Sequence, residues 1–265
     1  MEALRLYSRF IGVAIRSRME YRSDFLVGIV SVIVLNYVNL TLIWVLVNQF
    51  RALQGWSLWE IVMLYAVWTL SHSIHAVFFW HVTTLEDDIL SGRFDQYLVR
   101  PCSPLVQYLG KEVNYMGVAD AVFAISAFLL AYVNLALDWA PWKWAFLVVA
   151  ILSGTAIESG IAWICGSLAF WTGRSSSIFY VTLRFNILTQ QYPIDVFGRW
   201  FRAFVTGFLP VAFVNYFPLT VLLIKMPAIG PPWIGYLSPV VAIFVVSVGA
   251  IVWSRGVTSY ASSGN

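Results

Sequence analysis

Residues 25–47 read FLVGIVSVIVLNYVNLTLIWVLV, a stretch without a single Asp, Glu, Lys or Arg. A membrane-spanning helix needs about 20 consecutive apolar residues, so this stretch predicts a transmembrane helix. The whole chain of 265 residues shares the bias, because 60% of it is hydrophobic and only 11% is charged. A soluble domain carries about 25% charged residues. Too few charges remain here to cover a surface in water, and the composition excludes an ordinary soluble protein.

Further apolar stretches follow along the chain. They predict four more spans, at about residues 59–82, 113–135, 144–171 and 234–253. Two middle stretches are less regular: residues 177–191 are weakly apolar, and residues 201–224 are apolar but interrupted. The sequence therefore predicts one all-α membrane domain with six or seven crossings.

The distribution of basic residues decides between six and seven crossings, since Lys and Arg are retained on the cytoplasmic side. The N-terminal segment contains five arginines, and the loops after the second and fourth spans are also basic. Outer loops over the same stretch carry only Arg51 and Lys143. Arg255 after the last span favours a cytoplasmic C-terminus, which requires six crossings.

One of the two middle stretches should then not cross fully. Tyr192-Pro193 is expected to end the first stretch, while Pro210 and Pro218 are expected to interrupt the second, because proline removes a backbone donor. We interpret residues 193–225 as a re-entrant helical hairpin in the outer leaflet; a seventh crossing is the alternative. The basic residues of the hairpin would face outward: Arg199, Arg202 and Lys225.

The N-terminal segment has its own pattern. Leu4, Tyr7, Ile11 and Ile15 recur at helical spacing, and arginines occupy another face. The pattern predicts an amphipathic interfacial helix over residues 1–22, lying on the anionic inner leaflet. A simple positive tag that sets the orientation is the plainer alternative.

The loop after the second span reads TTLEDDILSGRFDQYLVRP over residues 83–101. Thr83 with Glu86 predicts a capping box, and the acidic residues that follow suit the first turn of a helix. Gly92 is placed to end that helix in the left-handed conformation. The loop carries more apolar and aromatic residues than a solvated loop requires. It therefore predicts a helix that docks a cytosolic partner, or else one that lies back on the bilayer.

The pattern Gly92-x-x-Asp95-x-x-Leu98-x-Arg100-Pro101 resembles the cytoplasmic element of ABC type-2 exporter permeases, most of all a bacterial branch of similar chain length. Tyr192-Pro193, Pro210 and Tyr216-Phe217-Pro218 resemble the later half of that branch. The resemblance covers nearly the whole chain, although the individual motifs are loose.

The resemblance implies a permease subunit of an exporter in the bacterial inner membrane, with both termini in the cytoplasm. It implies a separate cytosolic ATPase dimer and a second permease chain, either identical or, as we favour, a related sister chain. Residues 84–101 would be the coupling helix, with these contacts to the ATPase: Glu86, Asp87, Asp88, Leu90, Gly92, Arg93, Phe94, Asp95, Leu98 and Arg100. The outer gate would include Tyr192, Pro193, Pro210 and Pro218.

The chain itself lacks a nucleotide-binding motif. Gly110-Lys111 is its only Gly-Lys pair, and Glu112 follows without the upstream glycine of a phosphate-binding loop. We therefore expect no catalytic residue and no cofactor in this chain, with ATP and Mg²⁺ bound by the partner ATPase.

Three ionisable residues fall inside the predicted spans: Asp120, Glu158 and Arg184. An unpaired charge in the membrane costs several kcal/mol, so we expect Arg184 to pair with Glu158 or Asp120. Such a pair would lock helices together, or it would bind cargo or switch states.

Other function classes remain open as alternatives. His72 and His75 share a helix face, as the ligands of a haem or metal site do. They lack a partner on their span, however, so interhelical hydrogen bonding is the better interpretation. A secondary transporter is the main alternative, although no inverted repeat is visible. A membrane enzyme is a weaker one. The transported substance is not predicted.

Overall fold

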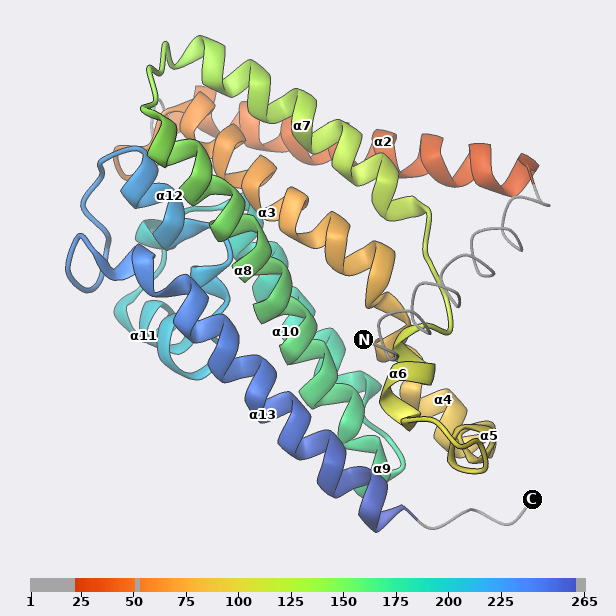
Figure 1. Ribbon diagram of the computed structural model, residues 1–265. Helices are drawn as coiled ribbons and strands as arrows, with labels where there is room; N and C mark the ends of the chain where they lie inside the picture. Colours follow the sequence, from red (N-terminus) through yellow and green to blue (C-terminus); the bar gives the residue numbers. More distant parts are fainter. Residues whose placement is uncertain (1–21, 51–52, 261–265) are drawn as a thin grey trace.

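The computed structural model describes residues 22–50 and 53–260, and this part is built of helices and connecting turns (Figure 1). The predicted interfacial helix over residues 1–22 lies outside the described residues, apart from Arg22. The body of the molecule is formed by six long helices: α2 (Arg22–Phe50), α3 (Leu58–Phe78), α7 (Met116–Asn134), α8 (Pro141–Ser167), α10 (Ser176–Gln191) and α13 (Ser238–Ser259). The predicted all-α fold is confirmed.

Five of the described helices are long and apolar enough to cross a membrane, namely α2, α3, α7, α8 and α13. A sixth is added if the bent pair Arg199–Phe208 and Val211–Leu222 forms one span. The second span is shorter than predicted, because α3 ends at Phe78 and a tighter 3-10 turn, η1 (Trp80–Thr84), follows. The hydroxyls of Thr83 and Thr84 bond back to main-chain oxygens of this turn, which favours it over a continued helix.

The long helices pack in sequence across the molecule. α7 lies against α2 and α3, α3 lies against α8, and α13 runs along α8, while α10 covers α3 and α8 (Figure 1). Glycines allow the closest approaches. A Cβ added at Gly117 of α7 would come within 2.6 Å of the Ser73 carbonyl oxygen, and one at Gly154 of α8 within 2.6 Å of Ser71 Oγ. Small residues therefore hold this bundle together, as is usual between helices in a membrane.

Short helices gather at the two ends of the bundle. The first end, which we call the α4 end, contains α4 (Leu85–Leu90), α5 (Asp95–Leu98), α6 (Pro104–Leu109) and α9 (Ala169–Thr172). The opposite end, the α12 end, contains η2 (Ile194–Val196), α11 (Arg199–Ala203), η3 (Phe204–Phe208), η4 (Val211–Phe213), α12 (Tyr216–Leu222) and η5 (Ile234–Leu237). Figure 1 shows the two groups on opposite sides of the long helices.

The prolines of the later half differ in what they do. α10 ends at Gln191 directly before Tyr192-Pro193, as predicted, and Pro210 lies at a bend of 78° between η3 and η4. The prediction that Pro218 interrupts a helix is wrong. Pro218 lies in the first turn of α12, where a main-chain N–H has no partner within the helix and its loss costs little.

Both ends of the segment 193–225 lie against the beginning of α3. Near one end, the Trp56 ring N–H donates to Asp195 Oδ2 at 2.9 Å. At the other end, Lys225 Nζ forms an ion pair with Glu60 at 2.8 Å and lies 4.8 Å from the centre of the Trp56 ring. Both ends of the segment therefore lie beside the beginning of α3, with the bend at Pro210 between them.

Gly235 of η5 provides a test of the packing at this end. A Cβ at this position would overlap the carbonyl oxygen of Phe217 in α12, whereas one at Gly207 would meet nothing within 4 Å. We expect Gly235→Ala to destabilise the protein by about 2 kcal/mol, because backbone atoms must move apart to admit the methyl group. Gly207→Ala is the matched control and should change little. Thermal unfolding in detergent measures both, and equal melting temperatures for the two variants would contradict the packing.

Candidate functional site

The segment 84–101 forms two short helices joined by a left-handed turn. Gly92 has a φ of +69°, as predicted for the residue that ends α4. The predicted capping box is wrong, because Thr83 bonds back to the Trp80 carbonyl oxygen and Glu86 turns away from the start of its own helix. Glu86 has better donors elsewhere, on a helix almost ninety residues later.

Glu86 bonds to the beginning of α10. Its Oε2 atom accepts hydrogen bonds from the main-chain N–H groups of Ser175 and Ser176, each at 2.6 Å. The first N–H groups of a helix have no partner within it, and the Ser175 side chain does not cap α10. A carboxylate at this place is also favoured by the helix dipole. Glu86 therefore caps α10 from α4 and joins the two helices directly.

Asp88 holds the α4 end together from inside. Its side chain is 2% exposed, and it accepts hydrogen bonds from Arg93 Nε at 2.8 Å, from Tyr108 Oη at 3.2 Å and from Lys111 Nζ. Burial alone would raise the pKa of Asp88, but the hydrogen bonds from Lys111 and Arg93 outweigh it and hold the pKa below its ordinary value. The carboxylate is thus charged and ties α4 to the turn that follows it, to α6 and to Lys111 just after α6.

An aromatic cluster attaches the same segment to the long helices. Phe94 is fully buried, with its ring 5.0 Å from that of Phe170 and 5.9 Å from that of Trp253 in α13. Ile89 and Tyr97 belong to this cluster as well. These three side chains stabilise the chain itself and are covered. The large apolar side chains of the segment that stay exposed are Leu90, Leu98 and Val99, at 51%, 42% and 81%.

His81 lies in η1, with its ring 5.5 Å from that of Tyr108, and it should make the stability of the protein depend on pH. Burial of the ring, with a smaller contribution from Lys111, lowers the pKa of His81 to about 4. The unfolded chain has the ordinary value of about 6.5, so stability is complete above pH 6.5 and is lost as pH falls toward 4, because the unfolded state binds the proton first.

We expect the melting temperature in detergent to fall between pH 7 and pH 5, and to fall less in a His81→Gln variant. The difference should approach about 1.4 kcal/mol for each pH unit below 6.5. Other groups that titrate in this range are present in both proteins and cancel in the comparison. Identical slopes for the two proteins would show that His81 does not set this dependence.

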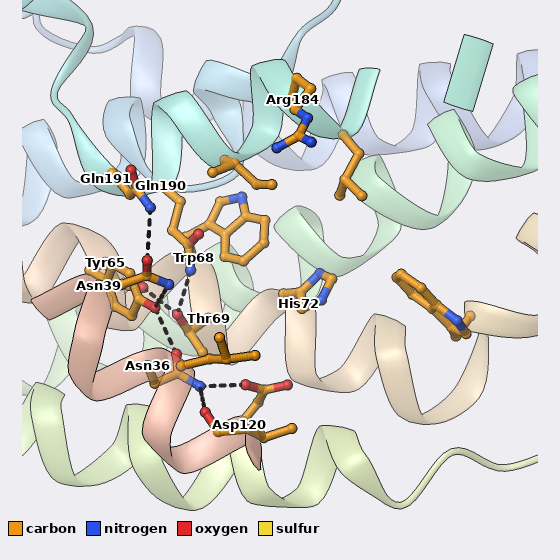
Figure 2. Close-up of a pocket in the computed structure, with 15 residues that line it drawn as sticks. Asn36, Asn39, Tyr65, Trp68, Thr69, His72, Asp120, Arg184, Gln190 and Gln191 are labelled. Atoms are coloured by element: carbon orange, nitrogen blue, oxygen red, sulfur yellow. Dashed lines mark hydrogen bonds between the residues drawn. The ribbon is translucent and has the colours of Figure 1, made fainter. Parts of the chain in front are cut away.

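A cavity of about 480 Å³ opens between the long helices (Figure 2). α3 forms its floor, α2 and α7 form one wall, and α10 forms the other. Tyr65 and Trp80 both line it, so the cavity extends roughly 20 Å along α3 and η1 at 1.5 Å per residue. The hydrocarbon core of a bilayer is about 30 Å thick. The cavity thus spans much of the depth that the long helices would occupy in a membrane.

Polar side chains line this cavity in a continuous chain of hydrogen bonds (Figure 2). Gln191 donates to Asn39 at 3.3 Å, and Asn39 donates to the Tyr65 hydroxyl at 3.4 Å. Tyr65 donates to Asn36 at 2.7 Å, and Asn36 donates to Asp120 Oδ1 at 2.8 Å. Every donor in this chain points toward Asp120, and Asn36 makes the last of the bonds. The chain joins α10, α2, α3 and α7.

The three intramembrane charges are placed differently from what the sequence suggested. Asp120 and Arg184 line the same cavity, yet within the described residues Arg184 forms an ion pair with neither acid. Glu158 Oε1 instead lies 2.9 Å from His72 Nδ1, and Asn36 bonds to Asp120. The acids have closer partners on α3 and α2, and Arg184 is directed into the cavity from α10 (Figure 2).

The histidines of α3 bond to α8. His72 contacts Glu158, and His75 Nδ1 lies 3.0 Å from Ser159 Oγ. The predicted interhelical hydrogen bonding is confirmed. Sequence reasoning looked for a partner on the same span and missed Glu158, which lies on the next helix that packs against α3. The two polar residues at adjacent positions of α8 were the available signal.

A family model described as ABC-2 family transporter protein matches residues 33–264, from the middle of α2 past the end of α13. The match includes both the segment 84–101 and the helices that line the cavity. No curated protein sequence and no solved structure matches the chain. The predicted resemblance is confirmed at the level of the family.

Proposed function

The chain belongs to the ABC-2 family of transporter proteins, and we propose that it is one of two permease chains of an ATP-driven exporter whose ATPase is a separate cytosolic polypeptide. Family membership identifies a membrane permease of an ABC transporter. The proposal adds the direction of transport, the pairing with a second permease chain, and the elements that carry out coupling and gating.

The connection between α4 and α10 carries this proposal. The segment 84–101 projects from one end of the bundle and exposes Leu90, Leu98 and Val99. Through Glu86 it is bonded to the first turn of α10, and α10 forms one wall of the cavity. A force applied to the projecting segment would therefore reach the cavity wall through one side chain. Asp88 and Phe94 are buried, so they would hold the segment in place while exposed residues contact the ATPase.

We propose six crossings, with α10 as the fifth. α10 has 16 residues and is about 24 Å long, which is short for a bilayer. Its first turn is bonded to α4, however, and Asp195 just beyond its end is bonded to Trp56 at the other end of the bundle. Both ends of the segment 193–225 contact the beginning of α3, and this supports a re-entrant hairpin there. Tyr192, Pro193, Pro210 and Pro218 would then belong to the outer gate.

With this topology the α4 end faces the cytoplasm and both termini lie inside, in the inner membrane of a bacterium. Two copies of the permease, or this chain with a related sister, would enclose the transport path, and the sister chain is the arrangement we favour. The cavity lined by α2, α3, α7 and α10 would be the part of that path contributed by this chain. ATP and Mg²⁺ would bind only to the ATPase.

Purification of the tagged chain from the cells that produce it, under gentle conditions, tests the proposal by mass spectrometry of the proteins that accompany it. We expect a nucleotide-binding protein and a permease chain. A variant with Leu98→Asp and Val99→Asp should lose the ATPase and keep the second permease, because both side chains are exposed and their replacement leaves the fold intact. Absence of any nucleotide-binding protein from the unmodified complex would refute the proposal.

A further inference from the structure

Asp120 and Arg184 line the cavity without forming an ion pair with each other, and a third titratable side chain of the lining, His72, contacts Glu158. Asp120 accepts a hydrogen bond from Asn36 on Oδ1, and no bond to its Oδ2 atom is found within residues 22–50 and 53–260. Arg184 faces the same space without an ion pair to any described residue. A charge left uncompensated at membrane depth costs several kcal/mol. Each of the two groups therefore favours a ligand of the opposite charge.

The surroundings of the two charges are of two kinds. Apolar side chains line the cavity beside them: Val32, Leu35, Leu183 and Ile187. Trp68 and Trp80 add aromatic rings, which attract cations through their faces. The volume of about 480 Å³ is within the range of small-molecule sites, about 300 to 1,000 Å³. The two charged side chains, the apolar lining and the volume of the cavity together suit a ligand with a charged head group and part of an apolar chain.

We propose that the cavity binds a zwitterionic amphiphile, with its anionic group at Arg184 and its ammonium group at Asp120. This rests on the proposed function and names the class of cargo that the transport path accepts. A ligand with only a negative charge would leave Asp120 uncompensated and be repelled by it. A ligand with only a positive charge would do the same at Arg184. A zwitterion satisfies both groups at once, and a guanidinium suits a phosphate or carboxylate in particular.

Native mass spectrometry of the purified protein tests the site with three lipids that share their acyl chains. Phosphatidylethanolamine carries both charges, phosphatidylglycerol only the negative one, and diacylglycerol none. We expect phosphatidylethanolamine to bind at least tenfold more tightly than either of the others. Free phosphoethanolamine is added in a further arm. Competition by it at similar concentrations would assign the same zwitterion site to a soluble cargo instead of a lipid.

Two variants separate this site from general lipid binding. Arg184→Gln should weaken phosphatidylethanolamine binding at least tenfold, and Arg184→Lys should restore most of it. Asp120→Asn should instead reverse the preference, because phosphatidylglycerol then meets Arg184 without repulsion. Arg199→Gln, at the α12 end, is the control and should match the parent. A structural role for the two charges would lower the melting temperature without producing this reversal.

Equal binding of the three lipids, or the same preference in all variants, would overturn the inference. These outcomes are independent of the ATPase. If an ATPase copurifies and the lipids bind equally, the transporter stands and the cargo class fails. If the zwitterion binds selectively and no ATPase is found, the site stands and the ATP-driven exporter fails.

Discussion

Replacing Glu86 with alanine is expected to leave ATP hydrolysis by the proposed ATPase in place, while the response of the cavity to ATP that we propose is lost. Glu86 makes two hydrogen bonds of 2.6 Å to the first turn of α10. Bonds to a charged acceptor contribute about 1.5 to 3 kcal/mol each. The loss of even one such bond should reduce the coupling between α4 and α10 by roughly tenfold to a hundredfold, since about 1.4 kcal/mol corresponds to a factor of ten.

A single cysteine in the cavity reports the response without knowledge of the cargo. In a Cys102→Ser background, Asn39→Cys is labelled with a water-soluble thiol reagent in the presence and absence of ATP; Cys165 is buried. ATP should change the labelling rate in the parent and leave it unchanged in Glu86→Ala. Gln96→Ala, which removes an exposed polar side chain from α5 of the same segment, is the control. A normal ATP response in Glu86→Ala would exclude this connection from the mechanism.

Replacement of Asp88 with asparagine should cost more stability than that of any other acid on α4. The buried carboxylate holds Arg93, Tyr108 and Lys111 together. Removing one partner of a buried ion pair costs about 3 to 5 kcal/mol. The side chains of Arg93 and Lys111 are 58% and 29% exposed, so they recover some hydration, and we expect a loss of about 3 kcal/mol.

That loss should lower the melting temperature of the purified protein by about 5 to 10 °C. Asp87→Asn serves as the control, with a change near zero, since Asp87 is exposed on the same helix. Limited proteolysis between residues 84 and 101 gives a local measurement of the same effect. A melting temperature for Asp88→Asn close to that of the control would mean that the aromatic cluster alone holds the segment.

The spans were predictable because the cost of leaving polar groups in the membrane acts on every residue of a helix. The stretch 25–47 needed no knowledge of its neighbours, and Tyr192-Pro193 and Gly92 act through local backbone geometry. Pro218 was misjudged for a local reason, since its effect depends on its position within the helix. A shift of a few residues changes an interruption into an accepted first-turn proline.

The contacts of the site were not predictable in the same way. Glu86 and Ser175, or His72 and Glu158, lie almost ninety residues apart and meet only through packing of helices. Periodicity shows which face of a helix is polar, but not which helix lies opposite. The expectation that Arg184 pairs with Glu158 or Asp120 had this weakness. It compared the depths of the three residues in the membrane, but depth does not show which helices are neighbours. The part that Asn36 and Thr69 play in lining the cavity likewise depends on the fold.

The glycine contacts of α3, α7 and α8 have a consequence for how the protein can move. A helix pair in which backbone meets backbone has no side chains that could change rotamer and absorb a displacement. These helices are therefore expected to move as one stiff body. α2 is attached more loosely, with only 11% of its apolar window buried, and α10 is fastened at its first turn by one carboxylate. Opening and closing of the cavity would then be a movement of α2 and α10 relative to a rigid body formed by α3, α7 and α8.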